Sequence, residues 1–511
     1  MYKNVLELLE FSAKTNPDKQ AIIDETKSLT YNEFVTAAKS VGSSLLSLNE
    51  QNKPVVILMK KSVACLVCMF GVTYSGNFYI VIDSDTPAQR ISSIFSTLSP
   101  VAVLVDKNTH ETIKAVNTNV NTICYESAST YPINPDGLIA IRKRQIDTDP
   151  LYVLFTSGST GIPKGTVICH RSVIDYAEWV TETFGISSQT VFGNQSPFYF
   201  SMSVLDIFST IRNAATLYIL PKTLFSFPLK LLEFIAEKEI NTLYWVPSVL
   251  IMIANWKALD YVELPKLTKV LFAGEVMPAK QLNVWIKHLP GVFFANLYGP
   301  TEITDICAYY VVNRPFKDDE SIPIGNACNN CDVFVIKEDG TQAGPSEEGE
   351  LYVRGSFLGF GYYNNSEKTR EVFVQNPLQQ HYPEPVYKTG DIVRFNEYGE
   401  LVYISRNDFQ VKRMGYRIEL GEIEAAINSI ENVNACACIY DKDTDSLNLY
   451  FTGSGVDENT VFTKAKEKLP PYMIPNKVIL VKQMPYNANG KIDRLALKKY
   501  TDTQKGDNKN G

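Results

Sequence analysis

Residues 156–165 have the composition of a phosphate-binding loop. They read Thr-Ser-Gly-Ser-Thr-Gly-Ile-Pro-Lys-Gly and follow the apolar run 151–155. Small residues let the backbone approach an anion closely, and successive N–H groups can form a concave anion site. Hydroxyl groups add donors, and Lys164 adds a positive charge. The stretch is not a P-loop, because Pro163 precedes the lysine and Gly165 follows it, where that motif needs Gly and then Ser or Thr. It indicates a different kind of nucleotide loop.

Six further motifs follow this loop. They are Tyr-Gly-Pro-Thr-Glu at 298–302, Gly-Glu-Leu-Tyr-Val-Arg-Gly at 349–355, Tyr-Lys-Thr-Gly-Asp at 387–391, Arg-Asn-Asp-Phe-Gln-Val-Lys at 406–412, Gly-Tyr-Arg-Ile-Glu-Leu-Gly-Glu-Ile-Glu at 415–424 and Asn-Gly-Lys-Ile-Asp-Arg at 489–494. In this order the seven motifs resemble the adenylate-forming superfamily of acyl- and aryl-CoA synthetases, non-ribosomal peptide adenylation domains and luciferases. Within it, the chain is most similar to stand-alone amino-acid adenylation enzymes and D-alanine:carrier-protein ligases.

The resemblance implies a ligase that uses ATP and Mg²⁺. A small carboxylic or amino acid would first become an acyl-adenylate, and the acyl group would then pass to the phosphopantetheine thiol of a separate acyl or peptidyl carrier protein. Two anions must meet in the first step, so the protein must neutralise phosphate and aim the carboxylate at the α-phosphorus. No nucleophile of the chain is needed, because the incoming thiol belongs to the carrier.

The resemblance also assigns residues to these tasks. Tyr298 would stack on adenine, Asp391 would accept the ribose hydroxyls, and Arg406 would support the ribose side. The catalytic residues would be Lys491, which bridges carboxylate and α-phosphate, Thr301 near the α-phosphate, and Glu302, which holds Mg²⁺. The full expected set of ATP-binding residues is Thr156, Ser157, Gly158, Ser159, Thr160, Gly161, Lys164, Asn296, Tyr298, Gly299, Asp391 and Arg406.

Two half-reactions at one site require a rearrangement, because thiol attack needs Lys491 out of the way. Asp408 stands at the family position about which the small C-terminal domain rotates. Gly415 would line the pantetheine tunnel, where a side chain would block entry. We therefore expect a mobile C-terminal domain that carries the catalytic lysine.

The substrate pocket departs from the family pattern. Amino-acid enzymes place Asp in Phe-x-Phe-Asp-x-Ser-Val-x-Asp to pair with the substrate ammonium, whereas Ser201 stands there in this chain. Asp305 occupies a position where relatives have a small or apolar residue. The substrate therefore either lacks an α-ammonium or directs its amino group elsewhere. The expected substrate-binding residues are Ser201, Met202, Leu205, Tyr244, Ala273, Leu297 and Asp305, with Leu271 beside them.

Alternating strand and helix patterns must position these residues. Short apolar runs at 54–59, 78–82, 101–105, 152–155, 217–220, 242–245 and 269–272 are separated by helical stretches. This alternation predicts an α/β fold with a large layered N-terminal domain of mainly parallel sheets. Shorter alternating strands with Gly turns at 332–401 predict a small barrel-like subdomain. Beyond it we expect a small mobile α+β domain, with a helix starting from residue 415 and strands at 434–440 and 446–452.

The expected domains are residues 1–407, which bind ATP and the acid, residues 408–500, which carry the catalytic lysine, and a disordered tail at 501–511. With 511 residues and 45% apolar content, the chain can bury several cores. Its net charge is −7 and its basic residues are scattered, so neither nucleic acid nor membrane is an expected partner. No signal peptide or long apolar span is evident, and the nine cysteines form no dense framework, so we expect a cytoplasmic protein.

Three weaker signals are assigned to structure rather than to function. The pair Cys328 and Cys331 has the spacing of one half of a zinc site. No second pair of Cys or His residues with such spacing accompanies it, so the pair indicates a turn. The Asp-Ser-Leu stretch 445–447 matches the phosphopantetheine site of carrier proteins, but it lies between two strand patterns. His170 is expected at the end of the strand after the phosphate loop, with no catalytic role.

Two other functions remain open at this stage. An acyl-CoA synthetase would have the same fold, although fatty- and aryl-acid enzymes carry a histidine before the substrate loop where this chain is aromatic, at 196–200. A non-catalytic nucleotide-dependent sensor or scaffold is the alternative of a different class. The intact set of Lys164, Glu302, Asp391 and Lys491 disfavours it, because a binding relic has no use for Lys491.

Overall fold

The computed structural model describes residues 2–116, 119–156, 163–406, 410–442, 444–485, 492–494 and 496–498. Contacts between residues divide the chain into two compact units. The first comprises Met1–Ser84, Thr97–Phe155 and Gly165–Asp408, and the second comprises Asp85–Ser96, Thr156–Lys164 and Phe409–Gly511. The predicted fold class is confirmed: the large N-terminal part contains mainly parallel sheets, and the smaller C-terminal part is α+β.

A six-stranded sheet carries the start of the predicted phosphate loop. Its order is β6-β5-β3-β4-β7-β8, and its pairings from β6 to β7 are parallel. Every residue of β3 and β4 is buried, as expected for strands covered on both faces. The strands are β3 (Pro54–Leu58), β4 (Phe78–Ile82), β5 (Ala102–Val105), β6 (Asn121–Cys124), β7 (Pro150–Thr156) and β8 (Lys164–Cys169).

A nine-stranded sheet carries the predicted substrate residues Tyr244, Ala273 and Leu297, with Leu271 beside them. Its order is β15-β14-β13-β12-β11-β9-β10-β1-β2, with a parallel centre from β13 to β1 and antiparallel strands at both edges. The strands are β1 (Gln20–Ile23), β2 (Ser28–Thr30), β9 (Val191–Asn194), β10 (Thr216–Ile219), β11 (Thr242–Trp245), β12 (Lys269–Ala273), β13 (Phe293–Tyr298), β14 (Ala308–Val311) and β15 (Asn326–Ala327).

The subdomain predicted to be barrel-like contains a five-stranded antiparallel sheet. The long strand β19 pairs with β17 on one side, and with β18 and β20 at its two ends on the other. The strands are β16 (Cys331–Ile336), β17 (Glu348–Gly355), β18 (Phe373–Gln375), β19 (Pro385–Phe395) and β20 (Leu401–Arg406). Asp391 and Arg406 are register partners on β19 and β20, so the sheet holds these two predicted ATP-binding residues side by side.

Helices connect the strands before residue 408. The helix α2 begins with a capping box, in which Thr30 and Glu33 bond reciprocally to each other's backbone N–H groups. The helices are α1 (Leu6–Thr15), α2 (Tyr31–Leu45), α3 (Val63–Tyr74), α4 (Ala88–Leu98), α5 (His110–Ala115), α6 (Tyr125–Ala128), α7 (Pro135–Arg142), α8 (His170–Phe184), α9 (Ser203–Asn213), α10 (Pro228–Glu237), α11 (Pro247–Asn255), α12 (Ala279–His288) and α13 (Ser366–Val372).

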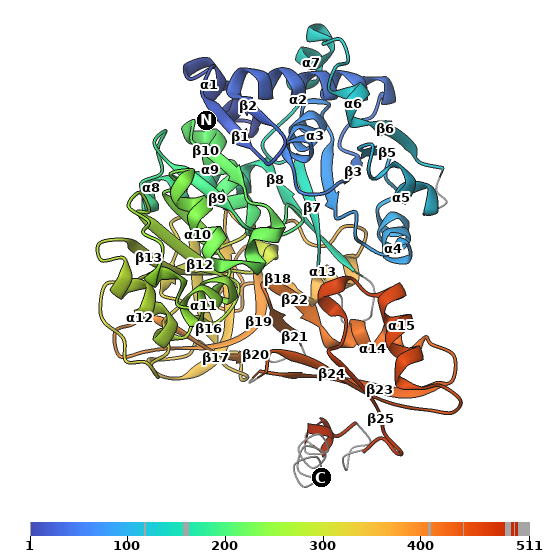
Figure 1. Ribbon diagram of the computed structural model, residues 1–511, viewed down its shortest axis with the longest axis vertical. Helices are drawn as coiled ribbons and strands as arrows, with labels where there is room; N and C mark the ends of the chain where they lie inside the picture. Colours follow the sequence, from blue (N-terminus) through green and yellow to red (C-terminus); the bar gives the residue numbers. More distant parts are fainter. Residues whose placement is uncertain are drawn as a thin grey trace. The chain divides into compact units, whose positions relative to one another are not determined.

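The C-terminal segment contains a hairpin, a second sheet and two helices. Its elements are β21 (Gln410–Arg413), β22 (Tyr416–Glu419), α14 (Leu420–Asn428), β23 (Val433–Asp441), β24 (Ser446–Gly453), α15 (Glu458–Lys468) and β25 (Lys477–Leu480). Figure 1 shows α14 and α15 side by side. Apolar side chains of both helices and of β23 and β24 form one buried core. The helix predicted from residue 415 begins at Leu420, because the preceding residues pair as a strand.

Two other predictions have definite outcomes. His170 is the first residue of α8, directly after β8, and its Nδ1 accepts a hydrogen bond from the Val5 N–H at 3.3 Å. Burial lowers the pKa of His170 to about 3, so the imidazole is neutral. Cys328 and Cys331 flank the turn into β16, and among the described residues no three His, Cys, Asp or Glu side chains are placed to hold a metal. No helix in the described ranges is long and apolar enough to cross a membrane.

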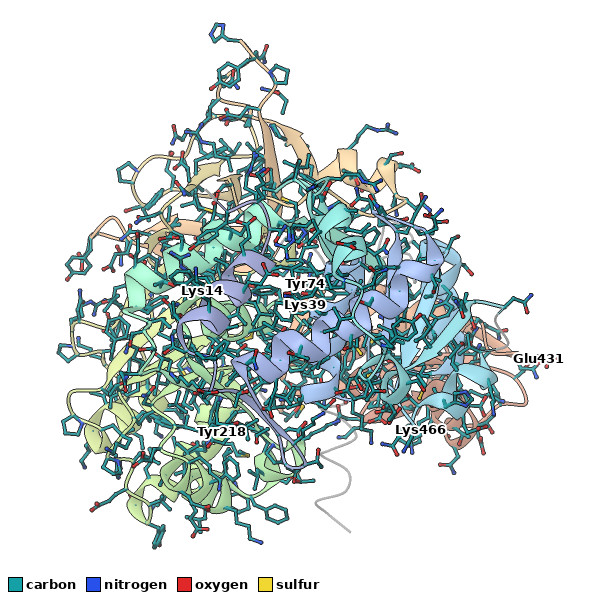
Figure 2. All side chains as sticks on the ribbon, turned by 90° about the horizontal axis from the view of Figure 1, so that it is seen from above. Lys14, Lys39, Tyr74, Tyr218, Glu431 and Lys466 are labelled. Carbon is teal, nitrogen blue, oxygen red and sulfur yellow. The ribbon has the colours of Figure 1, made fainter. Side chains whose placement is uncertain are left out.

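Close contact between α2 and α3 depends on glycine. A Cβ at residue 71 would lie 2.5 Å from the Cβ of Val41, and one at residue 42 would lie 2.6 Å from the Cβ of Tyr74. The two backbones therefore approach to a distance that no side chain permits. Figure 2 shows Lys39 of α2 beside Tyr74 of α3, and the Lys39 Nζ lies 5.8 Å from the ring centroid.

We predict that Gly71→Ala destabilises the first unit. The added methyl group would meet the Val41 Cβ, which cannot rotate away, and overpacking of this kind costs about 1–3 kcal/mol. Gly344→Ala is the matched control, because a Cβ there would first meet Glu347 Oε2 at 3.4 Å. Thermal unfolding followed by circular dichroism should show a lower midpoint for Gly71→Ala alone. Equal midpoints for both variants would contradict this account of the contact.

Candidate functional site

The predicted substrate residues converge where adjacent parallel strands end. Tyr244 on β11 is the register partner of Leu271 on β12, and Ala273 on β12 is the partner of Leu297 on β13. The carboxyl ends of parallel strands meet at one edge of a sheet, which is where α/β proteins bind ligands. The predicted apolar residues are all buried there: Met202, Leu205, Tyr244, Leu271, Ala273 and Leu297.

A tight return of the chain after β13 shapes the site. The chain leaves β13 at Tyr298, passes through the short 3₁₀ helix η4 (Thr301–Ile303) and returns as β14. A Cβ at Gly299 would lie 2.1 Å from the Asp305 carbonyl oxygen, so only glycine fits this crossing. The motif glycine, predicted as an ATP-binding residue, thus has a steric role in holding Asp305 in place.

The residue before Asp305 adopts a strained backbone conformation. Thr304 has φ of 73° and ψ of −61°, a region that a β-branched residue rarely occupies. The Asp305 N–H donates to the Ile303 carbonyl at 2.9 Å, which closes a turn around Thr304. The Thr304 hydroxyl donates to the Phe357 carbonyl at 2.8 Å and fixes the turn. Backbone strain of this kind costs about 1–3 kcal/mol and is typical of functional sites.

Asp305 lies in a shell of hydroxyl groups. Its Oδ2 accepts hydrogen bonds from the Tyr176 hydroxyl at 2.7 Å and from the Tyr244 hydroxyl at 3.0 Å. Ser201 lies near the carboxylate and favours its ionised form. Desolvation raises the pKa of Asp305 to about 7, and the three neighbouring hydroxyls only partly oppose that rise. The carboxyl group can therefore be neutral or ionised near neutral pH.

Ser201 connects Asp305 to the predicted catalytic turn. The Thr301 hydroxyl donates to Ser201 Oγ at 3.4 Å, and both residues are half-buried. Ser201 in turn lies near Asp305, whose carboxylate accepts from Tyr244 on β11, so these four polar side chains form one cluster between η4 and β11. This cluster links the residue expected near the α-phosphate to the residues expected around the acid substrate.

Asp391 lies in a second buried polar cluster. Its Oδ1 accepts from the Arg406 guanidinium at 2.7 Å, with only 8% and 3% of the two side chains exposed. Its Oδ2 accepts a hydrogen bond from the Tyr298 hydroxyl. Burial beside this carboxylate raises the pKa of Tyr298. The structure therefore brings together the three residues predicted to bind the adenine and ribose of ATP, although they lie in separate motifs.

Glu302 is fully buried in η4. Its Oε1 accepts a hydrogen bond from the Tyr362 hydroxyl at 2.7 Å, and its carbonyl accepts from the Gly359 N–H at 2.9 Å. Asn296, on β13, uses its side-chain amide to donate to the Pro323 carbonyl at 2.8 Å. Tyr362 and Tyr176 were not among the sequence-predicted residues, because no motif marks a tyrosine that acts on a residue far along the chain.

A third polar network lies near Asp305. The Asn194 side-chain amide donates to Asp206 Oδ2 at 2.7 Å, and the Lys61 ammonium donates to Asn194 Oδ1 at 3.1 Å. Desolvation raises the pKa of Asp206 to about 7 and lowers the pKa of Lys61 to about 7. Asp206, the last residue of the substrate motif, is thus joined through an amide to a lysine that sequence analysis did not select.

Two predicted residues have described partners or conformations in the second unit. Lys164 Nζ lies 3.3 Å from Glu419 Oε1, and both side chains are buried. Gly415 has φ of 79° and follows Met414 with φ of 50°, as required in the two-residue turn between β21 and β22. Thr156 ends β7. Seven predicted residues lie outside the described ranges: Ser157, Gly158, Ser159, Thr160, Gly161, Asp408 and Lys491.

Comparisons with known proteins agree with this geometry. Residues 9–363 match the family described as AMP-binding enzyme, and residues 422–491 match the AMP-binding enzyme C-terminal domain. The chain is 31% identical to zwittermicin A synthase ZmaJ of Bacillus cereus, over 96% of this chain and 94% of that protein. It is also 31% identical to an L-proline–[L-prolyl-carrier protein] ligase of Pseudomonas fluorescens, over 94% and 96% of the two chains.

The fold matches that of a solved adenylation domain. The Vibrio cholerae adenylation domain AlmE, in complex with glycyl-adenosine-5′-phosphate, superposes with a TM-score of 0.84 and 22% identity, over 98% of both chains. Because the sequence identity is only 22%, this similarity supports the fold and nothing further.

We predict that Asp305→Asn changes how stability depends on pH. Between about pH 4 and pH 7, the carboxyl group is ionised in the unfolded chain but protonated in the folded one, so wild-type stability falls as pH rises. The asparagine variant does not lose stability in this way. For one group, the loss in the free energy of unfolding reaches about 1.4 kcal/mol per pH unit. Both proteins keep Asp206 and Lys61, so the difference isolates residue 305. Denaturation midpoints would be measured for both proteins across this pH range. As the pH is lowered, the midpoint of the wild type should rise relative to that of Asp305→Asn. If the two midpoints change with pH in parallel, the pKa of Asp305 is not raised.

Proposed function

Because the chain belongs to the AMP-binding enzyme family, we propose that it activates a small carboxylic or amino acid with ATP and loads it onto a carrier protein. The first step would form an acyl-adenylate and release pyrophosphate. The second would transfer the acyl group to the phosphopantetheine thiol of a separate carrier protein. The prolyl-carrier ligase supports the carrier as acceptor, because its name states this partner and the two chains match over nearly their whole lengths.

The observation that carries the proposal is the cluster around Asp391. Three side chains from separate motifs meet there and are buried: Asp391, Tyr298 and Arg406. A carboxylate has about four lone-pair sites, so Asp391 can bond to Tyr298 and Arg406 and still accept from ribose hydroxyls. The guanidinium of Arg406 also holds this buried carboxylate in a fixed orientation. These properties support a nucleotide role for the cluster.

The donor set around η4 fits a magnesium ion that is bound together with ATP. Mg²⁺ takes oxygen ligands and is usually held by one or two carboxylates together with phosphate oxygens and water. Glu302 offers one buried carboxylate, oriented by Tyr362. We assign the ion to Glu302, where it would neutralise charge on the phosphates. Thr301, in the same turn, would contact the α-phosphate region.

The acid is proposed to lie outside the ordinary set of primary α-amino acids. Amino-acid enzymes of the superfamily carry aspartate where this chain has Ser201. A buried ammonium without a counter-charge costs several kcal/mol, far more than a serine hydrogen bond of about 1 kcal/mol returns. The pocket residue that does have a carboxyl group, Asp305, lies on a different wall, after η4.

We predict that a panel of acids will reveal acid-dependent pyrophosphate release. Amino, hydroxy and aryl acids would each be mixed with the enzyme, ATP and Mg²⁺, and pyrophosphate would be measured. At least one small acid should raise release well above the acid-free rate, and a magnesium chelator should remove that increase. In a second assay, either coenzyme A or a phosphopantetheinylated carrier protein would be added as the acceptor of the acyl group. The carrier protein should be acylated faster than coenzyme A. An acid-independent signal throughout would disprove the proposed activity.

We also predict that Lys491→Ala separates the two half-reactions. The lysine would act only in adenylation, so the variant should lose acid-dependent pyrophosphate release while still transferring acyl groups from a supplied acyl-adenylate to the carrier. The adjacent substitution Ile492→Ala is the control and should retain both activities. Equal losses of both half-reactions in Lys491→Ala would contradict the assignment of this lysine and the rotation about Asp408.

A further inference from the structure

Asp305 is a buried carboxyl group without a positively charged partner in the described part of the chain. Only 1% of the residue is exposed. The hydroxyls of Tyr176 and Tyr244 bond to it, the Ser201 side chain lies near it, and no described lysine or arginine forms an ion pair with it. The other titratable groups that interact with it are themselves acids, and they are Tyr152, Cys328 and Asp206. This differs from Asp391, whose charge is matched by Arg406.

Two independent features show that the chain is built to keep this carboxyl in place. Hydroxyls from α8 and β11 converge on one of its oxygens, which fixes the side-chain orientation. The backbone is held by the strained turn at Thr304 and by the crossing over Gly299. An acid retained in a buried, strained position with no internal cation indicates a cation supplied by a ligand.

The position of Asp305 relative to Ser201 identifies that ligand. Ser201 occupies the place where amino-acid enzymes of the superfamily present a carboxylate to the substrate ammonium. The Ser201 side chain lies near the Asp305 carboxylate and favours its ionised form. The carboxyl group that is missing at residue 201 is therefore present on a neighbouring side chain, which the same acid-binding site can use.

We propose that Asp305 binds the ammonium group of an amino-acid substrate, with Tyr176 and Tyr244 as positioning residues for its carboxylate. This inference rests on the proposed function, since it concerns the acid site of that reaction. Adenylation fixes the substrate carboxylate at the α-phosphate, so a shift of the counter-charge moves the amino group along the substrate. Polar side chains that are neighbours in a site lie about 3 Å apart or a little more, and a shift of that size corresponds to about two carbon–carbon bonds of about 1.5 Å. The substrate class is a small acid with its amine beyond the α-carbon.

The test compares acids that differ only in the amine. Propanoate, alanine, 3-aminopropanoate, butanoate and 4-aminobutanoate would be assayed by acid-dependent ATP–pyrophosphate exchange. The wild type should prefer a β- or γ-amino acid over its amine-free counterpart by about ten- to a hundredfold in kcat/KM, the range of one charge-assisted hydrogen bond. Asp305→Asn should remove this preference mainly through KM. Tyr176→Phe should weaken the preference without abolishing it.

A charge-swap variant keeps the proposal testable if single variants fold poorly. In Ser201→Asp combined with Asp305→Asn, the carboxylate returns to the wall where amino-acid enzymes carry it, so alanine should become the better substrate. Binding of ATP, measured by calorimetry, should remain close to wild type in every variant, which controls for folding.

The outcomes separate this inference from the proposed function. A wild type with no preference for any amine-bearing acid, or a preference for a β- or γ-amino acid that Asp305→Asn leaves unchanged, would overturn the inference and leave the ligase activity intact. A preference for alanine that Asp305→Asn abolishes would support the ammonium contact and contradict the proposed departure from α-amino acids. A preference for alanine that persists in Asp305→Asn would overturn the inference. Absence of exchange with every acid would contradict both.

Discussion

The crossing of the chain over Gly299 is the contact on which the site depends. The backbone leaves β13 at Tyr298, and the segment around Asp305 returns so closely that a single methyl group at residue 299 would collide with it. The positions of four features depend on that return: Tyr298, the buried Glu302, the turn at Thr304 and the carboxyl group of Asp305. A larger residue at 299 would separate β13 from β14 and displace all of them together.

Three buried aspartates near the site illustrate different solutions to one electrostatic problem. Asp391 is paired with an arginine. Asp206 is bonded to an amide and attracted by a nearby lysine, and desolvation still raises its pKa to about 7. The described neighbours of Asp305 are hydroxyls, and its pKa is raised to a similar value. The three carboxyl groups therefore differ in whether a described side chain supplies a positive charge.

This difference in partners is consistent with the different roles that we propose for these residues. A carboxylate held in a fixed orientation by an arginine is suited to accept hydrogen bonds from a sugar, whose hydroxyls carry no charge. A carboxyl group that can change its protonation state can admit either a neutral ligand or a cation, and the cation stabilises the ionised form. The proposed ammonium contact at Asp305 follows from this property together with the absence of a carboxylate at residue 201.

Short-range signals in the sequence were sufficient for the fold class and for most elements. The apolar runs at 78–82 and 242–245 coincide with β4 and β11, because a strand buried on both faces needs an uninterrupted apolar run. The helix predicted from residue 415 was misplaced by a few residues, since the positive φ values at Met414 and Gly415 form a hairpin turn instead. The local sequence pattern did not specify whether the residues after the turn would form a strand or the start of a helix.

The sequence by itself determined the family and the residues that we propose for the chemistry, because the spacing within each motif is a local property. It also marked Ser201 and Asp305 as departures from the family pattern. Only the tertiary structure decided that these two residues lie near each other, and that Tyr176, 129 positions from Asp305, orients its carboxylate. Such contacts depend on how α8, β11 and the turn after β13 pack against one another. No local pattern encodes that packing, since the free energy of burial depends on which surfaces meet and not on their order along the chain.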